Sequence, residues 1–136
     1  MESRDIELVA KWSLEFHREA LPFEPYSTEE ATRASELRVN EMRTFLWDFG
    51  GSPVAMASLA RPTRNTITVN GVYTPPARRK QGHAMRLVAA VSQEGLHRGK
   101  KFCVLHTDLN NPTSNSIYQK IGYRRIADSR NCQFIY

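Results

Sequence analysis

The chain has 136 residues, of which 40% are hydrophobic and 24% charged, and its formal net charge is +5. This length suits one domain whose core needs neither disulfides nor a structural metal. The sequence contains no low-complexity tract, no repeat and no apolar run near the roughly 20 residues that span a bilayer. Its first residues lack the apolar region of a secretory signal, so we expect a cytoplasmic protein whose two cysteines remain thiols.

The first forty residues predict two helices. Apolar residues recur at helical spacing over residues 5–21, and Pro22 ends that helix. Ser27 and Glu30 have the spacing of a capping box, which predicts a second helix to about residue 39. Four aromatic residues of this region are interpreted as core or hydrophobic-staple residues, with the wall of the acceptor pocket as the alternative. They are Trp12, Phe16, Phe23 and Tyr26.

A hairpin follows the two helices. Residues 42–49 alternate in polarity as a strand does, and residues 54–60 read as the returning strand. Gly50 and Gly51 between them supply the positive φ angles that a tight hairpin demands. A further turn at residues 62–65 leads to the next strand.

The central strand of the predicted sheet begins near Thr66 and ends with Val72-Tyr73-Thr74. Ile67, Val69 and Tyr73 form its apolar side and alternate with polar residues. Gly71 within the strand permits a bulge or a close approach of another backbone, although it could also merely relieve crowding.

A basic loop leads from this strand into a third helix. Residues 78–82 read Arg-Arg-Lys-Gln-Gly and stand directly before a helical apolar stripe. Unpaired amides and the macrodipole at a helix start favour an anion, and the loop adds positive charge. The stretch therefore predicts a diphosphate site. The stripe consists of Ala84, Leu87, Val88, Val91 and Gly95.

The last third of the chain predicts a strand, a helix and closing strands. Residues 101–107 form a short apolar run that a crossover would place beside the central strand. Asn111 is expected to cap the last helix, with Pro112 at its first position and Gly122 beyond its end. The closing strands are expected at 123–126 and 132–136.

Two motifs resemble those of the GNAT family of N-acetyltransferases. Arg79, Gly82 and Ala84 match the signature Q/R-x-x-G-x-G/A, which in this family holds the pyrophosphate of acetyl-CoA. Downstream, the segment from Asn111 through Tyr118, followed by Ile121-Gly122-Tyr123, resembles the family's N-x-x-A-x-x-x-Y-x-x-x-G-F segment. Two motifs in the right order are a stronger indication than either one alone.

The resemblance implies an α+β fold with a mixed, mostly antiparallel sheet flanked by helices. It implies one acetyltransferase domain over residues 1–136, with residues 1–40 on the acceptor side and residues 41–136 binding acetyl-CoA. The family's first strand has no counterpart before Asp5. The sheet is then one strand short or the chain is part of a longer protein, and whether a homodimer covers the open edge stays undecided.

The resemblance also implies a reaction, the transfer of acetyl from acetyl-CoA to a primary amine by direct attack in a ternary complex. Eleven residues are expected to contact the cofactor. They are Val72, Tyr73, Thr74, Arg79, Lys80, Gln81, Gly82, His83, Ala84, Asn111 and Tyr118. For His83, an exposed position in the loop is the simpler interpretation and a phosphate contact the more specific one.

Catalytic roles follow from the same resemblance. A backbone N–H of Val72 or Tyr73 would stabilise the thioester oxyanion. Tyr118 matches the tyrosine that protonates the departing thiolate, and His106 stands where some members carry a glutamate base. Tyr73 and Asp108 compete with His106 for the role of base.

Two alternatives remain beside this hypothesis. A CoA-binding or regulatory module of the same fold, without turnover, would carry the same loop. Nucleic acid is a less favoured partner, because the basic cluster at 78–80 is already explained by phosphates of CoA. The histidines and cysteines share no ligand spacing, so no metal is expected, and the acceptor amine is not identified.

Overall fold

The computed structural model describes residues 1–106 and 112–124. The chain divides into two compact units, residues 1–106 and residues 107–136, and each is described by itself. Asn111 and Asp108 lie outside the described residues, as does most of the segment expected to form closing strands.

The first unit contains each helix and strand that the sequence predicts for it. Its elements are η1 at Ser3–Asp5, α1 at Ile6–Ala20, α2 at Thr28–Glu41, β1 at Thr44–Phe49, β2 at Ser52–Ala60, β3 at Thr66–Tyr73, η2 at Pro76–Arg78, α3 at His83–His97 and β4 at Phe102–Leu105. Ser27 caps α2 as expected, because its hydroxyl accepts a hydrogen bond from the Glu30 backbone N–H at 3.1 Å.

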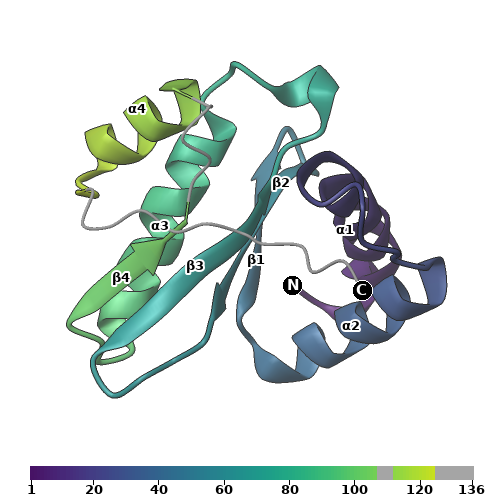
Figure 1. The fold of residues 1–136 in the computed structure, drawn as a ribbon, viewed down its shortest axis with the longest axis horizontal. Coiled ribbons are helices and arrows are strands. Elements are labelled where there is room, and N and C mark those ends of the chain that lie inside the picture. Colours follow the sequence, from purple (N-terminus) through teal and green to yellow (C-terminus); the bar gives the residue numbers. More distant parts are fainter. Residues whose placement is uncertain (107–111, 125–136) are drawn as a thin grey trace, which may run out of the picture. The chain divides into compact units, whose positions relative to one another are not determined.

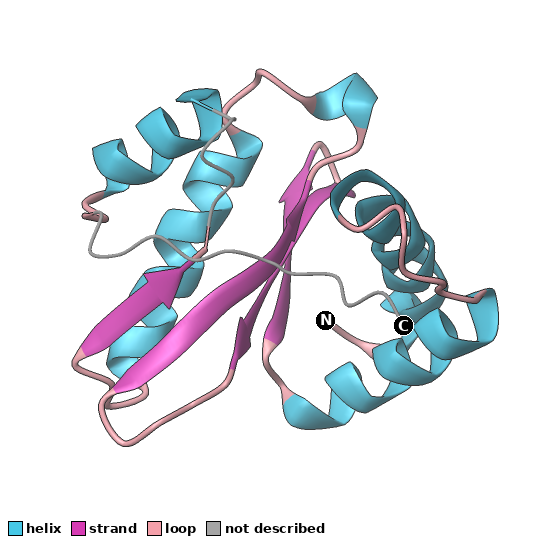
Figure 2. Ribbon diagram, viewed as in Figure 1, coloured by secondary structure: helices cyan, strands magenta, loops and turns pink. Residues whose placement is uncertain are grey.

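The four strands form one mixed sheet in the order β1-β2-β3-β4 (Figure 2). β1 with β2 and β2 with β3 pair antiparallel, whereas β4 runs parallel to β3. The parallel pair is joined by α3, which makes the crossover that a parallel connection requires. The hairpin between β1 and β2 turns at Gly50 and Gly51, as predicted.

Helices cover both faces of the sheet. α1 and α2 lie on one side and α3 on the other (Figure 1). On the α3 side, Gly95 allows the helix to approach the strands closely, since a Cβ there would lie 2.9 Å from Cys103 Sγ and 3.0 Å from Ile67 Cγ2. Cys103 is a free thiol, as expected.

A second cluster fills the space between α1 and the sheet. Val9, Trp12, Met56 and Tyr73 are buried together there, and Phe16 packs against them. This packing confirms the prediction that Trp12 and Phe16 belong to the core, whereas the same prediction for Phe23 is wrong. Phe23 is 72% exposed, because it lies in the turn after α1 rather than on the helix face.

β3 carries a bulge near its end, as Gly71 predicts. Ser58 pairs with Asn70 but Met56 pairs with Tyr73, so β3 has one more residue than β2 over this stretch. Gly71 has a φ of +60°, in the left-handed region that glycine favours. The extra residue corrects one expectation, because it turns Tyr73 to the α1 side although Ile67 lies against α3.

The second unit is described over α4, Pro112–Ile121, and the residues just after it. Pro112 is the first residue of α4 and Gly122 follows its last, both as predicted. The rings of Tyr118 and Tyr123 lie 6.4 Å apart, centroid to centroid. Among the described residues, no helix is both long and apolar enough to span a membrane.

Candidate active site

The bulged end of β3 contains backbone groups that lie outside the regular pairing of the sheet. Pairing of β3 with β4 runs from Thr66 with Phe102 to Val69 with Leu105. On the other side of β3, the pairing with β2 is interrupted by the bulge at Gly71. Val72 and Tyr73, two of the residues expected to contact acetyl-CoA, thus lie beyond the part of β3 that pairs with β4.

The basic loop connects this strand to α3 through two residues in the left-handed region. Lys80 has a φ of +64° and Gly82, the N-cap of α3, a φ of +81°. Such turns aim successive backbone N–H groups into a concavity that favours anions. The first amides of α3, from His83 onward, have no intrahelical acceptor and add the positive end of the helix dipole. The loop therefore has the geometry of an anion site.

Arg86 adds a cation to this loop that the sequence analysis missed. Its Nη1 donates to the backbone oxygen of Gln81 at 3.1 Å, and a Cβ built at Gly82 would lie 3.2 Å from the same nitrogen. Arg86 is exposed, so its side chain can move aside for a ligand or contact it. The signal was its spacing, because residue i+4 from a helix N-cap lies one turn above it.

Arg79 reaches toward the N-terminal part of the chain. Its Nε donates to the Thr74 backbone oxygen at 2.8 Å, and its Nη2 donates to both carboxylate oxygens of Glu19 at 2.8 and 2.9 Å. Its guanidinium carbon also lies 5.6 Å from the centre of the Tyr73 ring. Arg79, which is predicted to bind phosphate, is thus paired with Glu19 of α1 in this structure.

Tyr73 joins the strand end to α1. Its hydroxyl donates to Glu15 at 2.8 Å, and its ring lies 6.3 Å from that of Trp12, centroid to centroid. Burial, together with the charge and hydrogen bond of Glu15, raises the pKa of Tyr73 to about 12. A phenol with that pKa holds its proton at neutral pH, which argues against Tyr73 as the general base.

His83 is buried beneath the loop, so its interpretation as an exposed loop residue is wrong. Only 3% of it is exposed, and its ring lies 5.0 Å from that of Phe49. Its Nε2 donates to Gln81 Oε1 at 3.0 Å, since that oxygen can only accept. Its Nδ1 and the Thr74 hydroxyl are buried without a hydrogen-bond partner. The ring thus contacts both Gln81 of the loop and Phe49 of β1.

The remaining predicted residues are spread over both units. Val72, Thr74 and Ala84 are half-buried, whereas Lys80 and Gln81 are exposed. His106 is exposed and directly follows β4. Tyr118 belongs to the second unit, where burial raises its pKa above the ordinary value.

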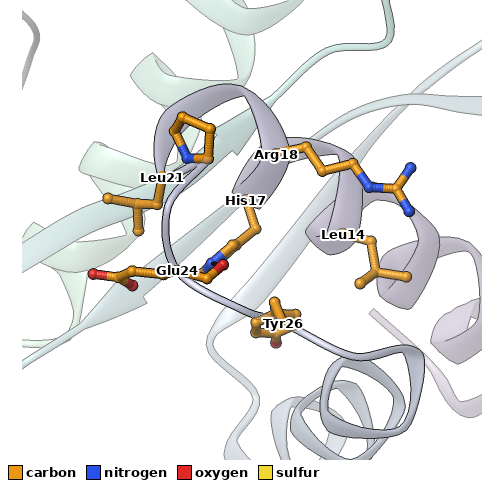
Figure 3. A pocket seen from close by; sticks show the side chains of 7 residues that line it. Leu14, His17, Arg18, Leu21, Glu24 and Tyr26 are labelled. Carbon is orange, nitrogen blue, oxygen red and sulfur yellow. Dashed lines mark hydrogen bonds between the residues drawn. The ribbon is translucent and has the colours of Figure 1, made fainter.

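A hollow of about 250 Å³ lies where α1 ends and the chain turns toward α2 (Figure 3). His17 donates from Nε2 to the Glu24 backbone oxygen at 2.9 Å, and its ring lies 4.6 Å from that of Tyr26. Tyr26 thus lines a small hollow, in line with the alternative of a pocket wall. The lining residues are Leu14, His17, Arg18, Leu21, Pro22, Glu24 and Tyr26.

Among the described residues, no three His, Cys, Asp or Glu side chains are grouped so that they could hold a metal ion. The charged groups around the loop include two carboxylates from α1, Lys80 and the arginines named above. Glu15 and Glu19 were missed by the sequence analysis, because their partners lie 58 and 60 residues away. Only their spacing of four, which puts both on one face of α1, could have indicated them.

A mixed sheet whose bulged strand leads through a basic loop into a helix defines an acetyltransferase type of fold. Sequence comparison agrees, because a sequence model of the acetyltransferase (GNAT) family matches residues 6–123. The chain belongs to this family. No curated protein sequence matches the chain.

Solved structures share the fold at low sequence identity. An aminoglycoside N-acetyltransferase, AAC(6')-Iy, in complex with CoA has a TM-score of 0.75 and 16% identity, over 98% of this chain and 91% of its own. A predicted acetyltransferase with acetyl-CoA from Clostridium acetobutylicum has a TM-score of 0.73 and 17% identity, over 98% and 92%. A ribosomal-protein-alanine N-acetyltransferase from Brucella melitensis has a TM-score of 0.79 and 17% identity, over 93% and 83%.

Proposed function

We propose that the protein is an N-acetyltransferase that transfers the acetyl group of acetyl-CoA to a primary amine. The observation that carries the proposal is the loop at 79–82, with left-handed Lys80 and Gly82 at the free amides of α3 and beside a bulged strand end. A diphosphate fits such a loop by charge and by hydrogen-bond donors. Solved structures of the same fold that contain CoA or acetyl-CoA support this cofactor.

The proposed reaction is direct attack in a ternary complex. The amine nitrogen bonds to the thioester carbonyl carbon, and a backbone N–H of Val72 or Tyr73 stabilises the oxyanion. The carbon–sulfur bond then breaks, and Tyr118 gives its proton to the thiolate. His106 takes the ammonium proton directly or through water. Its place one position beyond the Val69–Leu105 pair, exposed at the strand end, supports this role.

The same proposal includes the domain assignment, the acceptor site and the cellular location. Residues 1–136 would act as one domain, with residues 1–40 receiving the acceptor and residues 41–136 binding acetyl-CoA. The hollow beside Tyr26 is a candidate for part of the acceptor site, because it is built wholly from the first 26 residues. A cytoplasmic location is proposed from the sequence.

The first experiment is thermal unfolding with and without acetyl-CoA. A ligand at one hundred times its dissociation constant stabilises the folded state by about 2.7 kcal/mol. We expect a rise in Tm that grows with acetyl-CoA concentration. An unchanged Tm at saturating cofactor would remove the proposal.

Two glycine variants separate binding from stability. Gly82→Ala and Gly99→Ala each place a side chain at a positive φ, +81° and +93°, which costs about 1–2 kcal/mol. They stand at opposite ends of α3. We expect both variants to unfold more easily and only Gly82→Ala to bind acetyl-CoA more weakly. Equal affinities would contradict the assignment of the loop.

Turnover distinguishes the enzyme from a CoA-binding module without activity. Release of free thiol from acetyl-CoA is measured with a panel of primary amines that includes small amines, amino acids, aminoglycosides and peptide N-termini. Thiol release that depends on the amine supports the transferase. A thermal shift without thiol release for any amine favours the module.

A further inference from the structure

The contact between Arg79 and Glu19 links the phosphate loop to the helix on the acceptor side. Of the ion pairs in the described residues, it is the one that joins distant parts of the sequence, since the others span at most four positions. The same guanidinium also binds the Thr74 backbone oxygen. Two of the three guanidinium nitrogens of Arg79, Nε and Nη2, are therefore engaged on the side of α1 and β3.

The geometry of this contact bears on how Arg79 can bind a phosphate. An arginine binds phosphate with two parallel N–H bonds, from Nε with Nη2 or from Nη1 with Nη2. Nη2 takes part in both forks, and it is the atom that both oxygens of Glu19 contact. Either fork therefore brings the diphosphate to the nitrogen that Glu19 occupies, so the two anions compete for Nη2, and the fork through Nε also displaces the Thr74 oxygen.

The pair is weak enough to be exchanged. The side chains of Arg79 and Glu19 are 42% and 49% exposed, and ion pairs this accessible contribute little to stability. A diphosphate carries more negative charge than one carboxylate, and the amides at the start of α3 hold it in place. When acetyl-CoA is present, its diphosphate therefore competes successfully with Glu19 for the guanidinium of Arg79.

We infer that Glu19 is a positioning residue that holds Arg79 in the unliganded protein and competes with the diphosphate of acetyl-CoA for it. The inference rests on the proposed function. Acetyl-CoA binding opens the pair, so Glu19 lowers the affinity for the cofactor. The opened pair leaves the carboxylate of Glu19 uncompensated on the same face of α1 as Glu15, one helical turn away. Cofactor binding thereby makes the acceptor side more negative, which favours a cationic amine.

The test is a double-mutant cycle on the affinity for CoA, measured by calorimetry at physiological ionic strength. Glu19→Gln is expected to bind CoA roughly two- to fivefold more tightly than the wild type, the range of an exposed ion pair. Arg79→Gln is expected to bind more weakly. In the Arg79→Gln background, Glu19→Gln is expected to have no effect, because Glu19 acts only through Arg79.

The control is Glu36→Gln, which makes the same charge change at an exposed position of α2. A tighter Glu19→Gln with an unchanged Glu36→Gln supports competition. Weaker binding by Glu19→Gln would overturn it and assign Glu19 to holding Arg79 ready for the ligand. An equal gain in both single variants, or a gain that persists without Arg79, would also overturn it. A wild type that does not bind CoA would remove this inference and the proposed function together.

Discussion

Tyr73 lies where the charges of α1 meet the end of β3. Its hydroxyl donates to Glu15, and Arg79 lies over its ring. Burial and Glu15 together raise its pKa to about 12. The phenol therefore keeps its proton and orients Glu15, a role that follows from the contact and not from the position of Tyr73 in a motif.

The raised pKa of Tyr73 has a consequence for stability at alkaline pH. The folded state favours the protonated phenol, so its contribution is complete below the ordinary pKa of 10.0 and is lost as pH rises toward 12. Tyr73→Phe removes this dependence and the hydrogen bond to Glu15, at a cost of about 1–2 kcal/mol at neutral pH. Chemical unfolding of both proteins from pH 7 to 12 measures the difference.

The wild type is expected to lose its advantage over Tyr73→Phe across pH 10 to 12. A difference between the two proteins that stays constant over this range would contradict the assigned pKa.

At the scale of residues, the sequence indicated the loop but not the partners of its side chains. Gly82 and Gly71 were identified because positive φ angles restrict residue type strongly. Glu15, Glu19 and Arg86 were missed, since on a helix surface a charged residue looks the same with or without a partner. The buried position of His83 was also missed, because its neighbour Phe49 comes from the β1 hairpin.

At the scale of elements, hydrophobic period and turn chemistry predicted the helices and strands of the first unit. The period failed at one place, the facing of Tyr73, because a strand alternates only where no residue is added. The bulge itself is a feature of two strands, and its effect on side-chain direction depends on the pairing with β2.

The bulge predicts the outcome of replacing Gly71. A Cβ there would meet only Ser58 Oγ, at 3.9 Å, so space is available, but φ is +60°. Gly71→Ala is expected to lose about 1–2 kcal/mol of unfolding free energy from backbone strain alone. Gly71→Asn should lose less, since asparagine tolerates this conformation better. Denaturant unfolding checks the order, and equal stability of alanine and glycine would contradict it.

At Gly95, the packing of α3 predicts that alanine destabilises the protein, whereas helix propensity alone predicts that it stabilises it. Glycine to alanine in a helix interior ordinarily stabilises by up to about 1 kcal/mol. Here the new Cβ would lie 2.9 Å from Cys103 Sγ and 3.0 Å from Ile67 Cγ2, so overpacking of about 1–3 kcal/mol outweighs that gain. Gly95→Ala is expected to lower Tm.

A second variant tests the cause of that loss. Cys103→Ala removes the nearer of the two atoms, so it should destabilise less in the Gly95→Ala background than in the wild type. Additive losses would show that the contact with the thiol is not responsible.

At the scale of the whole molecule, the family and the sheet could be predicted because two motifs and the element order agree. The relation between the loop of the first unit and Tyr118 of the second is not a property of either motif. The proposed reaction uses both, because the thiolate that leaves acetyl-CoA takes its proton from Tyr118.

Tyr118→Phe tests this requirement. Burial raises the pKa of Tyr118, so the phenol is protonated at neutral pH and can serve as an acid. Loss of a general acid is expected to lower kcat by about 10²–10⁴-fold, with the affinity for acetyl-CoA nearly unchanged. Tyr123→Phe, five residues further along the chain and beside the same ring, is the control. A kcat that falls equally in both variants would contradict a specific role for Tyr118.

The surplus residue in β3 acts as a phase shift between two halves of one strand. Before it, Ile67 packs against α3, and after it, Tyr73 packs against α1. Deleting Gly71 would restore an uninterrupted ladder with Met56 still opposite Tyr73, so the ring would keep its direction while the kink disappeared. The anchoring of α1 and the shape of the strand's terminus are therefore separable properties of the same eight residues.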